Sequence, residues 1–389
     1  MRIVHTSDWH AGRTWRGIQR LDELAAVLDH LARFVAAEKV DLLLVSGDVF
    51  DTGAPIADAE DAVFAFLRRV GDHGVQSVVI AGNHDNPSRF TAWGRFASLA
   101  RVHVVARPAR ADEGGVLRLR TAAGETAIVA ALPFPRMADL VRAADIAAGD
   151  TAAHQTYADG TRRMVEHLCS SFAAGAVNLL VAHLHLQAAV LAGSERKVHV
   201  GEQWATTPQA LPPHAHYVAL GHIHRPQAVA APSPAEYAGS PLQLDFGEEG
   251  DRKSFVVVDA APGKPARVTR IPYEGGKEIR TVTAPLAELE ARASELRAAG
   301  WLRVRVPLPQ RDPELAAKVR RMLANAVAIE ALLPERTEAR EEPARPPAGA
   351  SPHELFAAYY AARHQRPPEP AVRDAFAALY AAHDDATAP

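Results

Sequence analysis

The sequence predicts a mixed α/β (α+β) fold in which two β-sheets pack face to face between helices, followed by a small α+β domain and a C-terminal helix pair. Two observations support this prediction. Residues 2–105 alternate short apolar runs with longer amphipathic stretches, the pattern of parallel strands joined by helical crossovers. After residue 116 the spacing shortens to hairpin lengths, so a single parallel sheet does not account for the chain.

The N-terminal elements follow from the spacing of apolar residues. Residues 2–6, 41–46 and 77–81 are strand-length segments rich in Val, Ile or Leu, which is typical of strands buried on both faces. Between them, residues 20–37 and 56–70 place apolar side chains on one helical face. We therefore expect parallel strands with helical connections.

Hairpins and further strands are expected in the middle of the chain. Residues 116–120 and 126–131 flank Gly124 and predict a hairpin. Residues 137–147 and 154–174 are expected to be helical. Further strands are expected to begin near Asn178, Tyr217, Ser254 and Arg267. A second sheet packed on the first would accommodate these strands.

Four segments are expected along the chain: a domain of residues 1–274, a capping domain of residues 275–333, a linker of residues 334–350 and a helix pair within residues 351–389. The linker is rich in Pro, Ala and charged residues, a composition that does not support a packed core. In the capping domain, strands and helices are expected to alternate over residues 279–284, 286–299, 301–307, 313–325 and 327–333.

The helix pair begins at Ser351, where Pro352 and Glu354 complete a helix start signal. Two helices of this length cannot enclose a core of their own. Their apolar and aromatic side chains therefore suggest a surface for a partner protein; the alternative is that the pair folds back on its own domain. The candidate contact residues are Leu355, Phe356, Tyr359, Tyr360, Phe376, Leu379 and Tyr380.

Composition argues against several classes of protein. The 389-residue chain has a formal net charge of −3, which disfavours DNA binding by bulk charge but allows a local basic groove or bound cations. The single cysteine, Cys169, excludes an intrachain disulfide and fits a reducing cytoplasm. We expect the chain to begin with a strand rather than a leader peptide, and its apolar stretches are too short to span a membrane.

Five polar motifs each follow an apolar run. The carboxyl ends of neighbouring parallel strands meet at one edge of a sheet, and an edge that collects carboxylate, amide and imidazole donors suits divalent metal ions. Each motif alone is more often structural, but five in this order predict a dinuclear metal site. The motifs are Asp8-Trp9-His10, Gly47-Asp48, Gly82-Asn83-His84-Asp85, His183 and Gly221-His222-Ile223-His224.

Alternation along an extended chain places side chains i and i+2 on the same side. Two motifs have this spacing, Asp8 with His10 and His222 with His224. Asp48 follows a strand and a glycine, so its carboxylate can approach two ions at once. His183 and His185 also alternate, and spacing alone leaves open which of the two is a ligand.

The series of motifs resembles the calcineurin-like metallophosphoesterase superfamily. The sequence around the first three motifs resembles, more narrowly, the SbcD family, the nuclease subunits of the bacterial SbcC–SbcD DNA-repair complexes. The three segments are Thr6-Ser7-Asp8-Trp9-His10-Ala11-Gly12-Arg13, Ser46-Gly47-Asp48-Val49-Phe50-Asp51-Thr52-Gly53 and Ala81-Gly82-Asn83-His84-Asp85-Asn86-Pro87-Ser88-Arg89. The resemblance is specific over residues 1–274 and looser beyond them.

The resemblance implies a two-sheet metallophosphoesterase sandwich that binds two divalent ions, with Mn²⁺ as the usual cofactor and Mg²⁺ as the alternative. The first ion would be held by Asp8, His10, Asp48 and His224. The second would be held by Asp48, Asn83, His183 and His222. His84 would be the catalytic acid or transition-state stabiliser, with Asp85 orienting it and favouring its protonated form. Some archaeal relatives carry a histidine where this chain has Asp51, so no role is transferred to that position.

The implied activity is that of a double-strand exonuclease and a single-strand or hairpin endonuclease in DNA repair and recombination. In the family, an SbcC-type coiled-coil ATPase receives the C-terminal helices, and the nuclease chain forms a homodimer, which gives a 2:2 complex. Candidate dimer helices are residues 58–70 and 89–99. The chain lacks Gly-x-x-x-x-Gly-Lys-Ser/Thr, so ATP would act through the partner. The expected location is the cytoplasm, in association with the nucleoid.

Two other interpretations stay open at this point. The same metals would serve a phosphatase or phosphodiesterase for a small molecule or a phosphoprotein. A non-catalytic adaptor would need a damaged site, whereas every expected type of ligand is present. Arginines near the motifs are candidates for contacts with DNA phosphates, with simple solvation as the alternative. They are Arg13, Arg16, Arg20 and Arg89.

Overall fold

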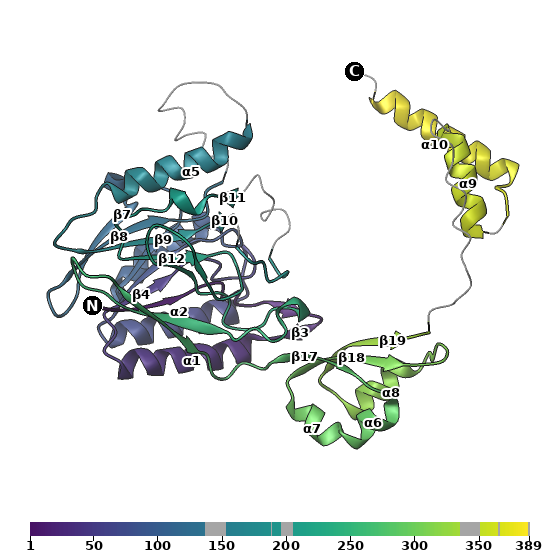
Figure 1. Cartoon of the computed structure of the whole chain (residues 1–389), viewed down its shortest axis with the longest axis horizontal. Coiled ribbons are helices and arrows are strands. Elements are labelled where there is room, and N and C mark those ends of the chain that lie inside the picture. Colours follow the sequence, from purple (N-terminus) through teal and green to yellow (C-terminus); the bar gives the residue numbers. More distant parts are fainter. Residues whose placement is uncertain (137–152, 188, 196–204, 335–350, 365, 388–389) are drawn as a thin grey trace. The chain divides into compact units, whose positions relative to one another are not determined.

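The computed structural model describes residues 1–136, 153–187, 189–195, 205–334, 351–364 and 366–387. The chain forms two compact units, Met1–Leu332 and Leu333–Pro389. The predicted helix at residues 137–147 and nearly all of the predicted linker, residues 335–350, lie outside the described residues. Figure 1 shows the elements of each unit.

The first six-stranded sheet is built largely from the N-terminal strands. Its elements and their helices are β1 Arg2–Thr6, α1 Leu21–Ala37, β4 Leu42–Val45, α2 Ala57–Asp72, β5 Gln76–Ile80, α3 Pro87–Ala97, β6 Val102–Val105, β15 Ser254–Asp259 and β16 Arg267–Pro272. The strand order is β16-β15-β1-β4-β5-β6, and β1, β4, β5 and β6 are mutually parallel. Helices α1, α2 and α3 cover its outer face through an apolar cluster that includes Leu28, Val63 and Phe90.

The second six-stranded sheet comes from the middle of the chain. Its elements and helix are β7 Val116–Arg120, β8 Thr126–Leu132, α5 Ala153–Cys169, β9 Val177–His183, β12 Tyr217–Gly221, β13 Gln227–Val229 and β14 Ala235–Tyr237. The strand order is β13-β14-β12-β9-β8-β7, with β8, β9, β12 and β14 mutually parallel. Val165 and Leu168 of α5 pack on its outer face.

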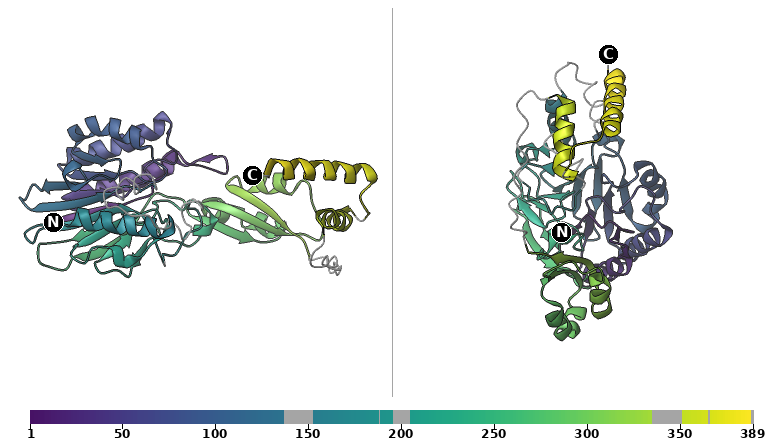
Figure 2. Two further views of the ribbon diagram at one scale, coloured as in Figure 1. Left: turned by 90° about the horizontal axis from the view of Figure 1, so that it is seen from above. Right: turned by 90° about the vertical axis from the view of Figure 1, so that its right-hand side faces the viewer.

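The two sheets pack face to face through a third apolar cluster, which includes Leu42 and Val78 from the first sheet and Val129 and Leu179 from the second. The central strands are therefore buried on both faces, which explains why they are continuous apolar runs rather than alternating ones. Figures 1 and 2 show the resulting layers, with helices outside both sheets. The predicted two-sheet sandwich is confirmed.

A smaller three-stranded sheet follows, in the order β17-β18-β19 and parallel throughout. Its elements are β17 Ile279–Thr283, α6 Leu286–Ala291, α7 Ala293–Ala298, β18 Trp301–Pro307, α8 Leu315–Met322 and β19 Ala326–Leu332. The single helix expected over residues 286–299 is two short helices, because the backbone of Arg292 leaves helical geometry at φ −98° and ψ 9°. We call residues 275–332 the cap; Trp301 Nε1 donates to Glu23 Oε1 of α1 at 2.8 Å and so ties the cap to the sandwich.

The second unit contains two helices, α9 Pro352–His364 and α10 Pro370–Thr387. The backbone N–H of Ser351 donates to Glu354 Oε2 at 2.7 Å, and that of Glu354 donates to Ser351 Oγ at 3.3 Å, as the start signal predicts. Phe356 and Phe376 stack with ring centroids 4.1 Å apart and join the two helices. Other apolar and aromatic side chains remain exposed: Leu355, Tyr359, Leu379 and Tyr380.

Several short elements were not expected, because two or three residues carry no measurable periodicity. They are β2 Thr14–Trp15 paired with β3 Ile18–Gln19, β10 His185–Leu186 paired with β11 Ala205–Thr206, and the 3₁₀ turns η1 Ser98–Ala100, η2 Ala111–Glu113, η5 Pro208–Ala210 and η6 Phe246–Glu248. Among the helices of the described ranges, none combines the length and the apolar character needed to cross a bilayer.

Candidate metal centre

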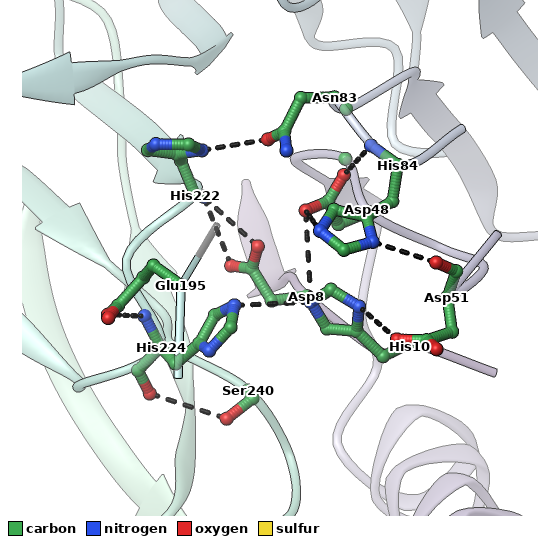
Figure 3. Close-up of polar contacts among 12 residues, drawn as sticks. Asp8, His10, Asp48, Asp51, Asn83, His84, Glu195, His222, His224 and Ser240 are labelled. Carbon is green, nitrogen blue, oxygen red and sulfur yellow. Dashed lines mark hydrogen bonds and ion pairs between the residues drawn. The ribbon is translucent and has the colours of Figure 1, made fainter. Parts of the chain in front are cut away.

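The five motifs meet at one edge of the sandwich. Each follows or ends a parallel strand: β1, β4 and β5 of the first sheet, and β9 and β12 of the second. Figure 3 shows Asp8, His10 and Asp48 from one group of loops and His222 and His224 from another, with their side chains gathered together. Segments more than 200 residues apart are joined here, since His222 N donates to Asp8 Oδ1 at 3.1 Å.

Four residues of the centre have left-handed backbone: Asp8 at φ 53°, His10 at φ 46°, Asp48 at φ 49° and His222 at φ 102°. Non-glycine residues rarely adopt this conformation, and such strain gathers at functional sites. Backbone hydrogen bonds between the loops offset it, from Asp8 N to Gly47 O and from His10 N to Asp48 O, each 3.0 Å. The loops are thus locked in a geometry that turns their polar side chains inward.

Glycines before the polar residues leave room for them. A Cβ at Gly82 would lie 2.1 Å from Asp48 Oδ1, and one at Gly47 would lie 2.4 Å from His183 Nδ1. A Cβ at Gly221 would lie 2.1 Å from Ser46 O. Because no side chain tolerates such approaches, these three glycines are required by close packing of the loops.

We predict that Gly82→Ala displaces the Asp48 carboxylate and weakens metal binding by about tenfold or more, the scale known for groups that orient metal ligands. Calorimetric titration with Mn²⁺ measures this. Gly175→Ala is the matched control, because a Cβ at that position would meet nothing within 4 Å. Native affinity in Gly82→Ala would show that the close approach of residue 82 to Asp48 is not needed.

The first predicted ligand set, Asp8, His10, Asp48 and His224, converges. His10 Nε2 lies 3.1 Å from His224 Nε2 and 3.7 Å from Asp48 Oδ2. One ligand atom from each of Asp8, His10 and His224 falls within 4.8 Å of the others. Two imidazole nitrogens turned toward each other beside two carboxylates form a donor set that suits a divalent cation.

The second predicted set, Asp48, Asn83, His183 and His222, lies beside the first. Asn83 Oδ1 lies 2.9 Å from His183 Nε2 and 2.8 Å from His222 Nδ1. Asp48 Oδ2 is 3.6 Å from His183 Nε2. The same Asp48 oxygen therefore reaches nitrogens of both sets, which is the geometry of a bridging carboxylate.

Between His183 and His185, the geometry favours His183 as the ligand. His183 Nδ1 bonds Ser46 O at 2.8 Å, and this leaves its Nε2 facing Asn83 and Asp48. The His185 ring lies 6.0 Å from the His222 ring, and its buried Nδ1 has no hydrogen-bond partner among the residues that the structure describes.

Burial sets the protonation of the centre. It lowers the pKa of His10 to about 4 and, together with His183, that of His222 well below its ordinary value. Burial also raises the pKa of Asp8 well above its ordinary value, helped by the charge of Asp48. Burial opposes ionisation of Asp48 as well, but His183, His84 and His10 lower its pKa below the ordinary value. Neutral imidazoles are the form that coordinates metals, and a cation would relieve the carboxylate repulsion, so these residues fit a pair of divalent ions.

His84 lies at the rim of the centre. Its backbone N–H donates to Asp48 Oδ1 at 2.8 Å, and its Nδ1 bonds the backbone O of Asp51 at 2.7 Å. The other ring nitrogen, Nε2, lies 4.0 Å from Asp48 Oδ2, and the side chain is 11% exposed. His84 is thus less enclosed than His10, His183 and His224, and it is held by its Nδ1 with Nε2 toward the centre.

Asp85 was expected to orient His84, but its carboxylate contacts backbone amides, and the His84 ring is held by Asp51 O instead. The Asp85 carboxylate accepts hydrogen bonds from three backbone amides, Gly82 N at 2.8 Å, Phe50 N at 3.0 Å and Val49 N at 3.2 Å. Burial, with a smaller contribution from Asp48, raises the pKa of Asp85 to about 7, while these amides act in the opposite direction. Adjacent side chains point apart in this turn, so Asp85 fixes the loop and Asp51 O holds the His84 ring.

Asp51 is a functional candidate that sequence reasoning set aside. Its Oδ1 lies 3.1 Å from His10 Nδ1 and 3.4 Å from Arg13 Nη1. This contact fixes the His10 ring with Nε2 toward the centre, and the Asp51 backbone O does the same for His84. The only sequence signal was its place three residues after Asp48.

A second group of polar residues that the sequence did not indicate lies behind His224. Glu195 Oε1 accepts the backbone N–H of His224 at 3.2 Å, and Ser240 Oγ lies 3.4 Å from His224 O (Figure 3). Ser194, Glu248 and Lys253 also contact this histidine. They come from loops without periodicity, and no motif pointed to them.

The four arginines lie in different surroundings. Arg13 pairs with Asp51, and Arg16 is exposed with its guanidinium over the Phe246 ring at 5.3 Å. Arg89 pairs with Glu60 at 2.9 Å. Arg20 is buried, and it bonds Glu23 Oε2 at 2.7 Å and also Gln243 O. Its burial and its partners argue against a role for Arg20 in contacting a phosphate.

The chain matches two sequence families. Residues 1–226 match the calcineurin-like phosphoesterase family. Residues 275–364 match a family described as the type 5 capsule protein repressor C-terminal domain. The first match covers more than half of the chain and includes every predicted ligand.

Three curated relatives are similar to the chain over most of its length, and each is named as the SbcD component of the nuclease SbcCD. That of Bacillus subtilis (strain 168) is 37% identical over 72% of this chain and 71% of its own. That of Rhodobacter capsulatus is 34% identical over 92% of this chain and 94% of its own. That of Escherichia coli (strain K12) is 28% identical over 88% and 86%.

Proposed function

This chain belongs to the calcineurin-like phosphoesterase family and, within it, to the SbcD nucleases, and we propose that it hydrolyses DNA phosphodiesters at a centre of two divalent ions. The observation that carries the proposal is the position of Asp48 Oδ2, 3.7 Å from His10 Nε2 and 3.6 Å from His183 Nε2. One carboxylate oxygen between two donor sets suits a bridged metal pair.

The two ions, when bound, would lower the pKa of a coordinated water and neutralise charge on the scissile phosphate. The chain's own residues hold this arrangement. Asp51 and Ser46 O fix the rings of His10 and His183 so that each presents Nε2. The left-handed loops keep the carboxylates of Asp8 and Asp48 in place without rearrangement.

We assign the role of general acid to His84. Its Nδ1 is held by Asp51 O, so Nε2 is the atom that would give a proton to the leaving sugar oxygen. Nε2 faces the centre, 4.0 Å from Asp48 Oδ2, and the side chain is partly accessible to a substrate. The hydrogen bond from the backbone N–H of His84 to Asp48 Oδ1 holds His84 beside the carboxylate that would bridge the two ions.

Mn²⁺ is the proposed cofactor, with Mg²⁺ as the alternative, because carboxylate and amide oxygens mixed with imidazoles suit a borderline cation. The proposed substrates are double-stranded DNA ends and single-stranded or hairpin DNA, in repair and recombination. Arg13 and Arg16, near the first motif, and Arg89 are the candidates for contacts with DNA phosphates. A cytoplasmic, nucleoid-associated location follows from such a substrate.

Comparing DNA with a phosphomonoester tests the proposed function. We expect Mn²⁺-dependent degradation of linear duplex DNA and nicking of an end-blocked hairpin, both abolished by chelator. Faster hydrolysis of p-nitrophenyl phosphate than of DNA would favour the alternative, a phosphatase. No hydrolysis of either substrate by protein that binds metal would favour a non-catalytic adaptor.

We propose that α9 and α10 bind the coiled coil of an SbcC-type ATPase. The support is that Leu379 is 72% exposed and Tyr359 60% exposed, while the contacts between the two helices include stacked Phe356 and Phe376 and leave these side chains outside. We predict that Leu379→Glu weakens co-purification with the ATPase by tenfold or more, about 1.4 kcal/mol, because a charge enters an apolar interface. Leu332→Glu in β19 is the control, 40% exposed and outside the helix pair. Equal capture of both variants would place the interface elsewhere.

We also propose that the chain forms a homodimer through α2, α3 and η1, which would give a 2:2 complex. Phe96 is 75% exposed and Leu99 86% exposed, and η1 lies against α2. We predict that Phe96→Glu with Leu99→Glu shifts the protein from dimer to monomer by light scattering. Metal binding should persist, because neither residue touches the centre. A dimer that survives both changes would contradict this interface.

A further inference from the structure

The ring of His224 is held from behind by a hydroxyl and a carboxylate. Ser194 Oγ lies 2.5 Å from His224 Nδ1 and donates its proton to Glu248 Oε1. Glu248 is fully buried, and its Oε1 is 3.6 Å from the same ring nitrogen. On the other edge of the ring, Nε2 faces His10 Nε2 at 3.1 Å.

Lys253 pairs with Glu248 in this buried place. Its Nζ lies 2.5 Å from Glu248 Oε2, which also accepts the backbone N–H of Leu244 at 3.1 Å. Lys253 Nζ donates in addition to the backbone O of His224 at 2.8 Å. Both members of this pair therefore contact the same histidine.

The direction of these hydrogen bonds determines the tautomer of His224. A serine hydroxyl has one proton, and here the proton goes to Glu248, an acceptor. Ser194 Oγ must therefore accept at its other contact, which requires that His224 Nδ1 carry the hydrogen. The lone pair of His224 is then on Nε2, the nitrogen that faces His10 Nε2 in the group of Asp8, His10 and His224.

We propose that Ser194 and Glu248 are positioning residues for one of the two metal ions: they fix the tautomer and ring orientation of His224, so that its Nε2 is the donor. The inference rests on the proposed metal centre. In many metalloproteins a carboxylate or carbonyl bonds directly to the ligand histidine and orients it. Here the Ser194 hydroxyl would take that role, supported by the buried pair of Glu248 and Lys253.

The neighbouring glutamate supplies a matched control. Glu249 is exposed, and its carboxylate binds the cap rather than the metal centre, accepting from Thr281 N at 2.7 Å and Thr281 Oγ1 at 2.6 Å. Within η6, Phe246 likewise packs toward the cap, in a cluster with Trp15 and Ile279. Adjacent carboxylates of one turn thus face two different surroundings.

Titration of the metal-free full-length protein with Mn²⁺, by calorimetry and by electron paramagnetic resonance, tests the inference. His224→Ala first identifies the binding phase that depends on this ligand. Ser194→Ala should weaken that phase by about 10- to 100-fold and leave the other phase within about twofold. Ser194→Thr, which keeps the hydroxyl, should bind like the unmodified chain, and Glu248→Gln should resemble Ser194→Ala. Glu249→Gln should bind both ions normally.

Two outcomes would overturn the inference. Native binding of both ions by Ser194→Ala would show that the hydroxyl does not position the ligand, while the proposed metal centre would stand. Equal weakening of both phases, or a metal-free melting temperature well below that of Glu249→Gln, would show a general structural role instead. Failure of the unmodified chain to bind two ions would overturn the proposed function itself and is recognised in the first titration.

Discussion

Replacing His84 with alanine will lower DNA cleavage by about 10²- to 10⁴-fold and leave both metal ions bound. The effect is large because the leaving sugar alkoxide needs a proton, and His84 Nε2 is positioned to give it while Nδ1 is held by Asp51 O. Binding survives because the contact of residue 84 with Asp48 comes from the backbone N–H, which alanine keeps. Cleavage assays with Mn²⁺ and calorimetric titration of the same preparation measure the two effects.

A histidine outside the centre is the control for this substitution. His73, the C-cap of α2, can be replaced by alanine with no expected change in cleavage or in metal binding. If His84→Ala loses metal together with activity, His84 has a structural role and the assignment as general acid is incorrect. If cleavage is unchanged, the proton comes from another group.

Replacing Asp48 with asparagine will remove both ions and reduce cleavage to the level measured with chelator. The carboxylate oxygen Oδ2 lies near nitrogens of both ligand sets, so its loss as an anionic bridge affects both at once. Asparagine keeps the shape of the side chain and an oxygen that can accept the backbone N–H of His84. Titration with Mn²⁺ should therefore detect no tight site in a protein that is still folded.

Ligands that belong to one set supply the comparison for Asp48. His224→Ala and Asn83→Ala should each remove one ion and keep the other, since each touches one set. Retention of one ion by Asp48→Asn with native affinity would show that Asp48 does not bridge. Loss of both ions in Asn83→Ala would show that the two sites depend on each other by another route.

The convergence of the five motifs could be predicted because each stands directly at the end of an apolar strand. Parallel strands β1, β4 and β5 bring their carboxyl ends to one edge, and packing of the second sheet adds His183 and His222. These strands are buried on both faces and are therefore continuous apolar segments, which can be recognised as strands, and placed in order, from the sequence alone. This is why the fold class could be predicted together with the place where the polar motifs meet.

The supporting residues could not be predicted, because tertiary contacts alone bring them to the centre. Ser194 and Glu195 come from an irregular loop and Glu248 from the short turn η6, and they reach His224 from up to 30 residues away with no periodic pattern to indicate it. The partner of His84 was predicted incorrectly because adjacency in sequence suggested Asp85. In the turn after β5, neighbouring side chains diverge, and a backbone carbonyl of another loop takes the place.

Diffraction from crystals of the Mn²⁺-loaded protein, measured at the manganese absorption edge, tests the central claim most directly. We predict two anomalous peaks about 3.5–4 Å apart, with the Asp48 carboxylate between them. One peak should lie beside His10 and His224, and the other beside Asn83 and His183. A single peak, or two peaks too far apart for Asp48 to contact both, would contradict a bridged two-metal centre.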